Sequence, residues 1–187
     1  MVNGTKDMNA KLIRLVVIAG VAGAAWLWGD ADTSARSGDP VVEFAPGDQV
    51  MGAAQAAAQS HLPKFLEAAL SDTGQSKPDT LVKVAFPVDD PNGSDMGVEV
   101  IWVGPFARTV DGFSGFLANE PVAMPGYHAG SSVAFDEDMI RDWILPGPDG
   151  RAWGHYTTRV IAAQSQDENF QAMISQILMP DPAPKDW

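Results

Sequence analysis

The feature that most constrains this chain is a change in the spacing of its apolar residues near residue 80. Apolar residues recur at helical spacing from residue 50 to residue 70. From residue 80 to residue 109 they alternate with a period of two, as they do in half-buried strands. Helical spacing then returns over residues 165–178. Strands flanked by helices, instead of alternating with them, are typical of the α+β class.

Two helices are predicted at the ends of this pattern. The first runs from Asp48, which can cap it, to Leu70, and Pro63 should kink or split it because proline removes a backbone donor. The second lies within "SQDENFQAMISQILMP", where Ser165 and Glu168 have the spacing of a capping box.

The strands between them are short and are separated by turn signals such as Asn-Gly. They are predicted at "TLVKVAFPV", "VEVIWVGPFART", "FSGFLAN", "SSVAF" and "AWGHYTTRVIAA". We expect a small antiparallel sheet or a partly open barrel, with an N-terminal helix and a C-terminal helix packed on it.

The N-terminus has the pattern of an export signal. Lys11 and Arg14 precede an uncharged run from Leu15 to Gly29. Residues 1–29 are therefore predicted to be a signal peptide that is cleaved, or a membrane anchor over residues 12–29 that is retained. Either outcome places the rest of the chain in the periplasm or elsewhere outside the cytoplasm.

Beyond this segment, three parts are expected. Residues 30–46 are rich in Asp, Ser, Gly and Pro and are predicted to be a tether. Residues 47–178 are predicted to form a single α+β domain, and residues 179–187 a loose tail.

The composition argues against several functions. The chain has 24 acidic and 12 basic residues, a net charge of −12 that repels phosphate backbones, so no nucleic-acid partner is expected. It has no cysteine, so thiol nucleophiles, disulfides and thiolate metal sites are excluded. His128 and His155 lack a partner at metal-ligand spacing, and no metal or other cofactor is predicted.

Three ionisable residues are candidates for catalysis. Asp142, next to Trp143, could be a carboxylate in an apolar pocket with a raised pKa, and Glu99 lies in the middle of a predicted strand. His155 is the third candidate, unless it lines a strand with its ring at the surface. The alternative is that Asp142 binds backbone amides and Glu99 pairs with Lys83 or Arg159 across the sheet.

The tryptophans Trp102, Trp143 and Trp153 have two interpretations. They can fill the core, or they can be exposed anchors for a peptide or glycan. Ser114 in "GFSGF" does not fit the G-x-S-x-G elbow of hydrolases, because Phe116 occupies the last position.

Six segments follow one another at familiar distances: "LPKFLEAAL", "VKVAF", "VEVIWV", "DGFSGFLANEP", "GSSVAFDEDMIRDW" and "GRAWGHYTTR". In this order the chain resembles the YegJ-like family of bacterial proteins, a domain of unknown function, over roughly residues 48–162. The resemblance implies one small domain behind an export signal. It carries no catalytic residues, because the family has no assigned activity.

The sequence thus favours a non-enzymatic binding module of the cell envelope whose partner is a protein or a glycan. The alternative is a hydrolase that uses Glu99, Asp142 and His155. A purely structural or immunity-like partner protein is a third interpretation.

Overall fold

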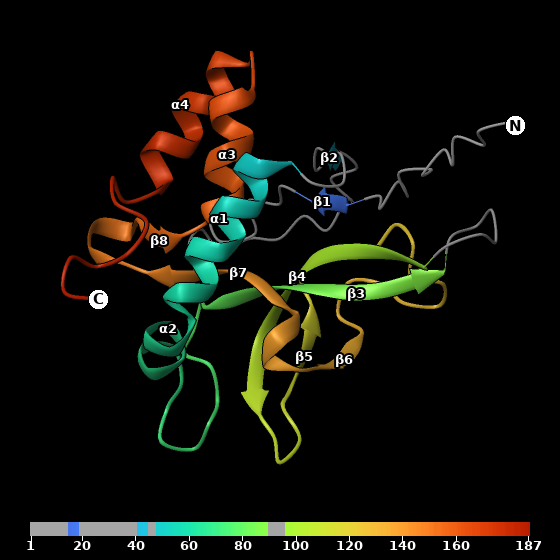
Figure 1. Ribbon diagram of the computed structural model, residues 1–187. Coiled ribbons are helices and arrows are strands. Elements are labelled where there is room, and N and C mark those ends of the chain that lie inside the picture. Colours follow the sequence, from blue (N-terminus) through green and yellow to red (C-terminus); the bar gives the residue numbers. More distant parts are fainter. Residues whose placement is uncertain (1–14, 19–40, 45–47, 90–95) are drawn as a thin grey trace, which may run out of the picture.

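The computed structural model describes residues 15–18, 41–44, 48–89 and 96–187. Its helices are α1 (Gln49–Ser60), α2 (Leu62–Ala69), α3 (Tyr156–Gln164) and α4 (Glu168–Ile177). Its strands are β1 (Leu15–Ile18), β2 (Val41–Phe44), β3 (Leu81–Asp89), β4 (Met96–Arg108), β5 (Phe113–Leu117), β6 (Ser132–Phe135), β7 (Ile140–Pro146) and β8 (Ala152–Gly154). Short 3₁₀ turns precede β7 and β8 (Figure 1).

The strands β3 to β8 form an antiparallel sheet around the long β3–β4 pair. Strand β7 pairs with the other edge of β3, and β8 pairs with β7. The second half of β4 pairs with β5, which pairs with β6. The sheet is not closed, so the predicted α+β class with helices packed on an antiparallel sheet is confirmed.

Little of the predicted N-terminal segment lies within the described residues. Leu15–Ile18 form β1, which runs parallel to β4, and Val41–Phe44 form β2, which pairs with β1. Strand β2 thus lies within residues 30–46, the predicted tether. The rest of residues 1–46 lies outside the described residues. Among the described helices, none has the length and apolar character needed to cross a membrane.

Helices α1 and α2 cover one face of the sheet (Figure 1). Asp48 caps α1 by accepting the amides of Val50 and Met51, as predicted. The predicted helix is split into α1 and α2 beside Pro63. Pro63 occupies the first turn of α2, where proline is tolerated because its missing N–H would have no helical partner. The ring of Phe65 on α2 stacks on Trp143 of the sheet, with centroids 4.9 Å apart.

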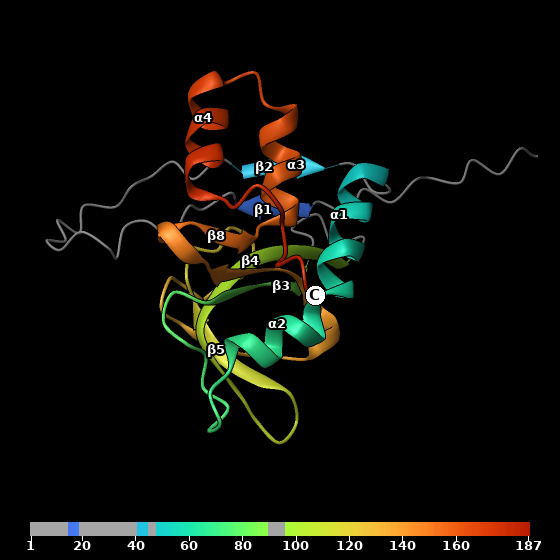
Figure 2. The same ribbon diagram turned by 90° about the vertical axis from the view of Figure 1, so that its left-hand side faces the viewer.

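The predicted last strand over residues 152–163 is wrong beyond Gly154. Strand β8 ends there, and the same β-branched residues continue as α3, which stands with α4 at one end of the sheet (Figure 2). Gly154 and His155 both have positive φ, +86° and +54°, which turns the chain out of the sheet. Tertiary packing then overrides local strand propensity, since Ile161 and Ala162 are buried on the inner side of α3.

The start of α4 also differs from the prediction. The cap is Asp167, which accepts the amides of Asn169 and Phe170, so Ser165 is not the cap. The apolar stripe of α4 packs as expected at Ile174 and Leu178, which form a small cluster with Ala162.

Residues 179–187 were expected to be loose, and the structure holds them against the domain. The amide of Met179 donates to the carbonyl of Ala152, and the amide of Gly154 donates to that of Pro182. The ring of Trp187 lies 5.6 Å from that of Trp143. The proline-rich composition of the tail gave no indication of these contacts.

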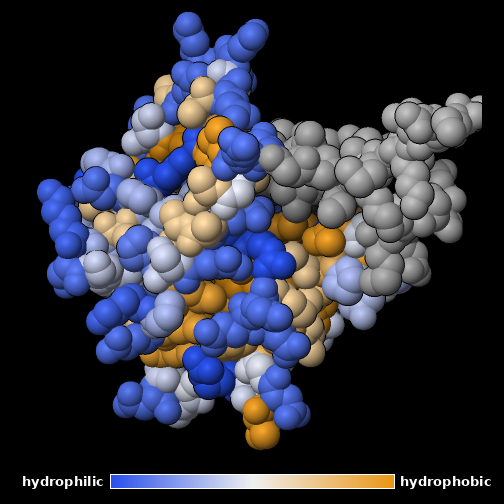
Figure 3. Space-filling model, viewed as in Figure 1, coloured by the Kyte–Doolittle hydropathy of each residue, from blue (hydrophilic) through white to orange (hydrophobic). Residues whose placement is uncertain are grey.

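The sheet buries side chains on both faces. The larger cluster, under α1 and α2, includes Val84, Ile101 and Trp143, and a smaller one on the opposite face is built on Leu81, Trp102 and Ile144. In the view of Figure 3 hydrophilic residues dominate the outer surface, and hydrophobic ones show mainly in the hollows between elements.

Candidate functional site

A line of buried polar side chains crosses three neighbouring strands on the face opposite α1 and α2. Lys83 on β3 lies opposite Trp102 on β4 and Asp142 on β7 in the strand register. All three side chains are fully buried. Cross-strand partners project to the same side of a sheet, so the fold itself brings these residues together.

Asp142 is the hub of this line. Its Oδ1 accepts the amides of Trp143 (2.8 Å) and Tyr156 (3.0 Å). Its Oδ2 accepts the amide of Thr157 (2.8 Å) and the Thr157 hydroxyl (2.6 Å). The carboxylate therefore ties the start of α3 to β7. Burial raises the pKa of Asp142, and the charge of Lys83 and these hydrogen bonds oppose that rise.

Lys83 completes the network from β3. Its Nζ donates to the Thr157 hydroxyl at 3.2 Å and lies 4.7 Å from the centre of the Trp102 ring. Burial lowers the pKa of Lys83 to about 8, against the opposing effect of Asp142. The ammonium is thus stabilised by one hydroxyl, one aromatic face and one carboxylate charge.

His155 borders the same network at the turn from β8 into α3. Its ring is only 5% exposed, its Nδ1 lies 3.2 Å from the Thr158 hydroxyl, and its edge meets Trp102 with centroids 5.2 Å apart. Burial lowers the pKa of His155 to about 3, helped by the charges of Lys83 and Arg159. The imidazole is therefore neutral at physiological pH and packs against Trp102 beside the network.

Glu99 does not join these residues. It has the same strand parity as Ile101 and Val103, whose side chains belong to the cluster under α1 and α2. Both of its oxygens accept backbone amides, those of Val122 and Ala123, at 2.7 Å. Glu99 therefore anchors the long connection between β5 and β6. The three candidate catalytic residues are divided between the two faces of the sheet and do not meet.

The tryptophans divide between core and surface. Trp102 and Trp143 have no exposed surface, which favours the core interpretation over that of binding anchors. The indole N–H of Trp143 donates to the carbonyl of Ala58, whereas that of Trp102 has no hydrogen-bond partner in the described part of the chain. Trp153 is half-buried against the main cluster.

Sequence reasoning missed Lys83 and Thr157 as members of the buried network. One signal was present: Leu81, Lys83 and Ala85 alternate with Val82, Val84 and Phe86, so both faces of β3 are apolar. A strand buried on both faces must bury its lysine. The Nδ1 of His61, at the junction of α1 and α2, lies 2.9 Å from the hydroxyl of Tyr156 at the start of α3.

The described residues contain no group of three or more His, Asp and Glu side chains placed to hold a metal ion. Ser114 lies within β5, opposite Ala107 and Ala134, and so does not occupy a strand-to-helix elbow. His128 is exposed in the connection between β5 and β6.

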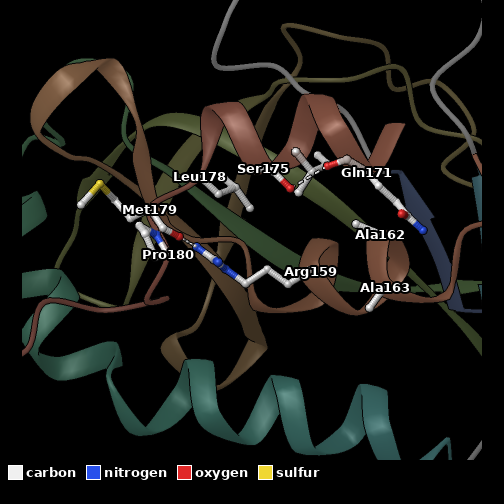
Figure 4. Close-up of a pocket in the computed structure, with 9 residues that line it drawn as sticks. Arg159, Ala162, Ala163, Gln171, Ser175, Leu178, Met179 and Pro180 are labelled. Atoms are coloured by element: carbon white, nitrogen blue, oxygen red, sulfur yellow. Dashed lines mark hydrogen bonds between the residues drawn. The ribbon is translucent and has the colours of Figure 1, made fainter. Parts of the chain in front are cut away.

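Two hollows of the described surface are candidate binding sites. One, of about 680 Å³, lies where β4 bends at Gly104 and Pro105, and the half-exposed ring of Phe116 forms part of its wall. The other, of about 560 Å³, lies between α3 and α4 and is lined by both apolar and polar side chains (Figure 4). Neither contains Glu99, Asp142 or His155 in its lining.

Comparison with known proteins places the chain in a family that has no known activity. No curated protein and no solved structure matches the chain. The family described as "Uncharacterized protein conserved in bacteria (DUF2314)" matches residues 48–176, which is more than half of the chain and includes every element from α1 to α3 and nearly all of α4. The chain belongs to this family of uncharacterised bacterial proteins.

Proposed function

We propose that this protein is a non-enzymatic binding module of the bacterial cell envelope whose partner is a protein or a glycan. The proposal rests on the burial and the hydrogen bonds of Glu99, Asp142 and His155. The two carboxylates are fully buried and hold backbone amides, and the imidazole is buried and neutral. These residues stabilise the fold, and the accessible features of the described surface are hollows suited to binding.

The envelope location rests on the sequence alone. Basic residues followed by an apolar run from Leu15 to Gly29 form the pattern of an export signal, cleaved or kept as an anchor. Fusing residues 1–40 to a reporter that is active only outside the cytoplasm tests this location. A stable fusion that stays silent would contradict it.

The binding role is tested by site-specific crosslinking in living cells. A photoreactive residue is placed in the full chain at Phe116 in one hollow, at Ala163 in the other, and at Val110 as a control. Val110 is fully exposed at the tip between β4 and β5 and lies in neither hollow. We expect a discrete adduct at Phe116 or Ala163 and none at Val110. The absence of adducts from both hollows would contradict a binding role.

A further inference from the structure

The hollow between α3 and α4 has a composition that singles out one class of ligand. Its apolar wall comes from Ala162, Ile174 and Leu178. Its polar groups are Arg159 on α3 and the side chains of Gln171 and Ser175 on α4 (Figure 4). The side-chain amide of Gln171 already donates to the carbonyl of Ser165 at 2.6 Å, which leaves Arg159 as the charged group of the hollow.

The guanidinium of Arg159 is held by two hydrogen bonds and keeps further N–H donors free of them. Its Nε donates to the carbonyl of Gly154 and its Nη2 to the carbonyl of Met179, both at 2.9 Å. A guanidinium has five N–H groups, so three remain for an acceptor. The two carbonyls hold the group rigidly, which lowers the entropy lost when a ligand binds.

Among the described residues, no carboxylate forms an ion pair with Arg159 within 4.0 Å. Asp142 and Asp181 act on it only electrostatically. The negative charge of Asp142 also acts on Lys83, so it does not serve Arg159 alone. Burial lowers the pKa of Arg159, so its charge is poorly solvated, and an anion in the hollow would relieve that cost.

We propose that this hollow binds a monoanionic carboxylate with a short apolar body. The guanidinium takes the carboxylate through two N–H groups, and the wall of Ala162, Ile174 and Leu178 covers the apolar part. A single Arg matches a single negative charge, whereas the net charge of −12 disfavours a dianion such as phosphate.

Two sources share this chemistry, a free short-chain acid and the C-terminus of a peptide that ends in an apolar residue. The peptide source rests on the proposed binding function, whose partner is a protein or a glycan, and a free acid would extend that function to a small molecule.

The test uses the full, isotopically labelled chain and NMR titration with pentanoate and with N-acetyl-Gly-Gly-Leu. Pentanamide and the C-terminally amidated peptide are neutral controls, and inorganic phosphate is the dianion. We expect saturable shifts in α3 and α4 with one or both carboxylates, in the millimolar range or tighter, and none with the amides. The tighter of the two carboxylates identifies the source.

Ser175 provides a matched pair of variants. Its side chain is exposed in the lining, and its hydroxyl donates only within α4, to the carbonyl of Gln171. Ser175→Asp adds a competing carboxylate, and Ser175→Asn adds nearly the same volume without charge. Binding should be about tenfold or more weaker in Ser175→Asp than in Ser175→Asn, which controls for the added volume.

Three results would overturn the inference: no saturable shift with either carboxylate, equal binding of the amides, or tighter binding of phosphate. The crosslinking experiment remains independent of these results. A discrete adduct at Phe116 or Ala163 together with a failed titration would reject the carboxylate and leave the binding role standing.

Discussion

The substitution Asp142→Asn tests whether the buried carboxylate stabilises the fold. Asparagine retains one acceptor oxygen, which can keep the amides of Trp143 and Tyr156. Its NH₂ group then faces two donors of Thr157, the amide and the hydroxyl. A buried donor left without an acceptor costs about 1–3 kcal/mol, and Lys83 also loses its counter-charge. Removing one partner of a buried charged pair costs about 3–5 kcal/mol. This value already includes much of the cost of the unsatisfied donor.

We therefore expect Asp142→Asn to lower the free energy of unfolding by about 3–5 kcal/mol. The measurement is urea unfolding of the full chain, followed by tryptophan fluorescence and circular dichroism. The double variant Lys83→Met, Asp142→Asn is the control, since it removes the unpaired ammonium. It should recover about 1–3 kcal/mol relative to the sum of the two single variants. A loss below about 1 kcal/mol in Asp142→Asn would refute the structural role of this carboxylate.

Three further substitutions test other parts of the fold. His155→Asn keeps a residue that tolerates positive φ but removes the imidazole, whose pKa is lowered to about 3. Because this pKa is lowered, the stability that His155 contributes above pH 6.5 is lost as the pH falls, by up to about 1.4 kcal/mol per pH unit. Between pH 6.5 and 4.5 the variant should therefore lose less free energy of unfolding than the wild type. Equal slopes of the free energy of unfolding against pH would contradict the burial of His155. Gly154→Ala should abolish folding, because its Cβ would lie 2.0 Å from the carbonyl oxygen of Trp143, and a soluble variant with wild-type unfolding would exclude this geometry. Glu99→Gln should speed amide exchange in residues 119–131 while the rest of the sheet stays protected, and unchanged exchange there would show that Glu99 does not anchor the connection.

The local parts of the fold could be predicted from the sequence. Asp48 caps α1, and Pro63 separates α1 from α2, because both effects involve residues within one helical turn. The change of period near residue 80 correctly indicated the start of β3, the first strand after α2.

The remaining features depend on contacts between distant residues. The entry into α3 requires His155, a non-glycine residue, to adopt positive φ, and its neighbours have strand propensity. The partners of Glu99 are amides more than 20 residues away, and the opposition of Lys83 and Asp142 depends on strand register. No local pattern encodes these pairings. The interpretation that Asp142 binds backbone amides is confirmed, but the partners of Glu99 and the pairing of Lys83 with Asp142 were not predicted.

The central claim is that the network around Asp142 is sealed inside the fold. Native-state hydrogen exchange at the amides of Tyr156 and Thr157, which donate to Asp142, tests it most directly. We expect both amides to exchange only through global unfolding, with the full free energy measured by urea. Exchange through a local opening several kcal/mol below that value would mean that solvent reaches Asp142 in the folded state, and would contradict the claim.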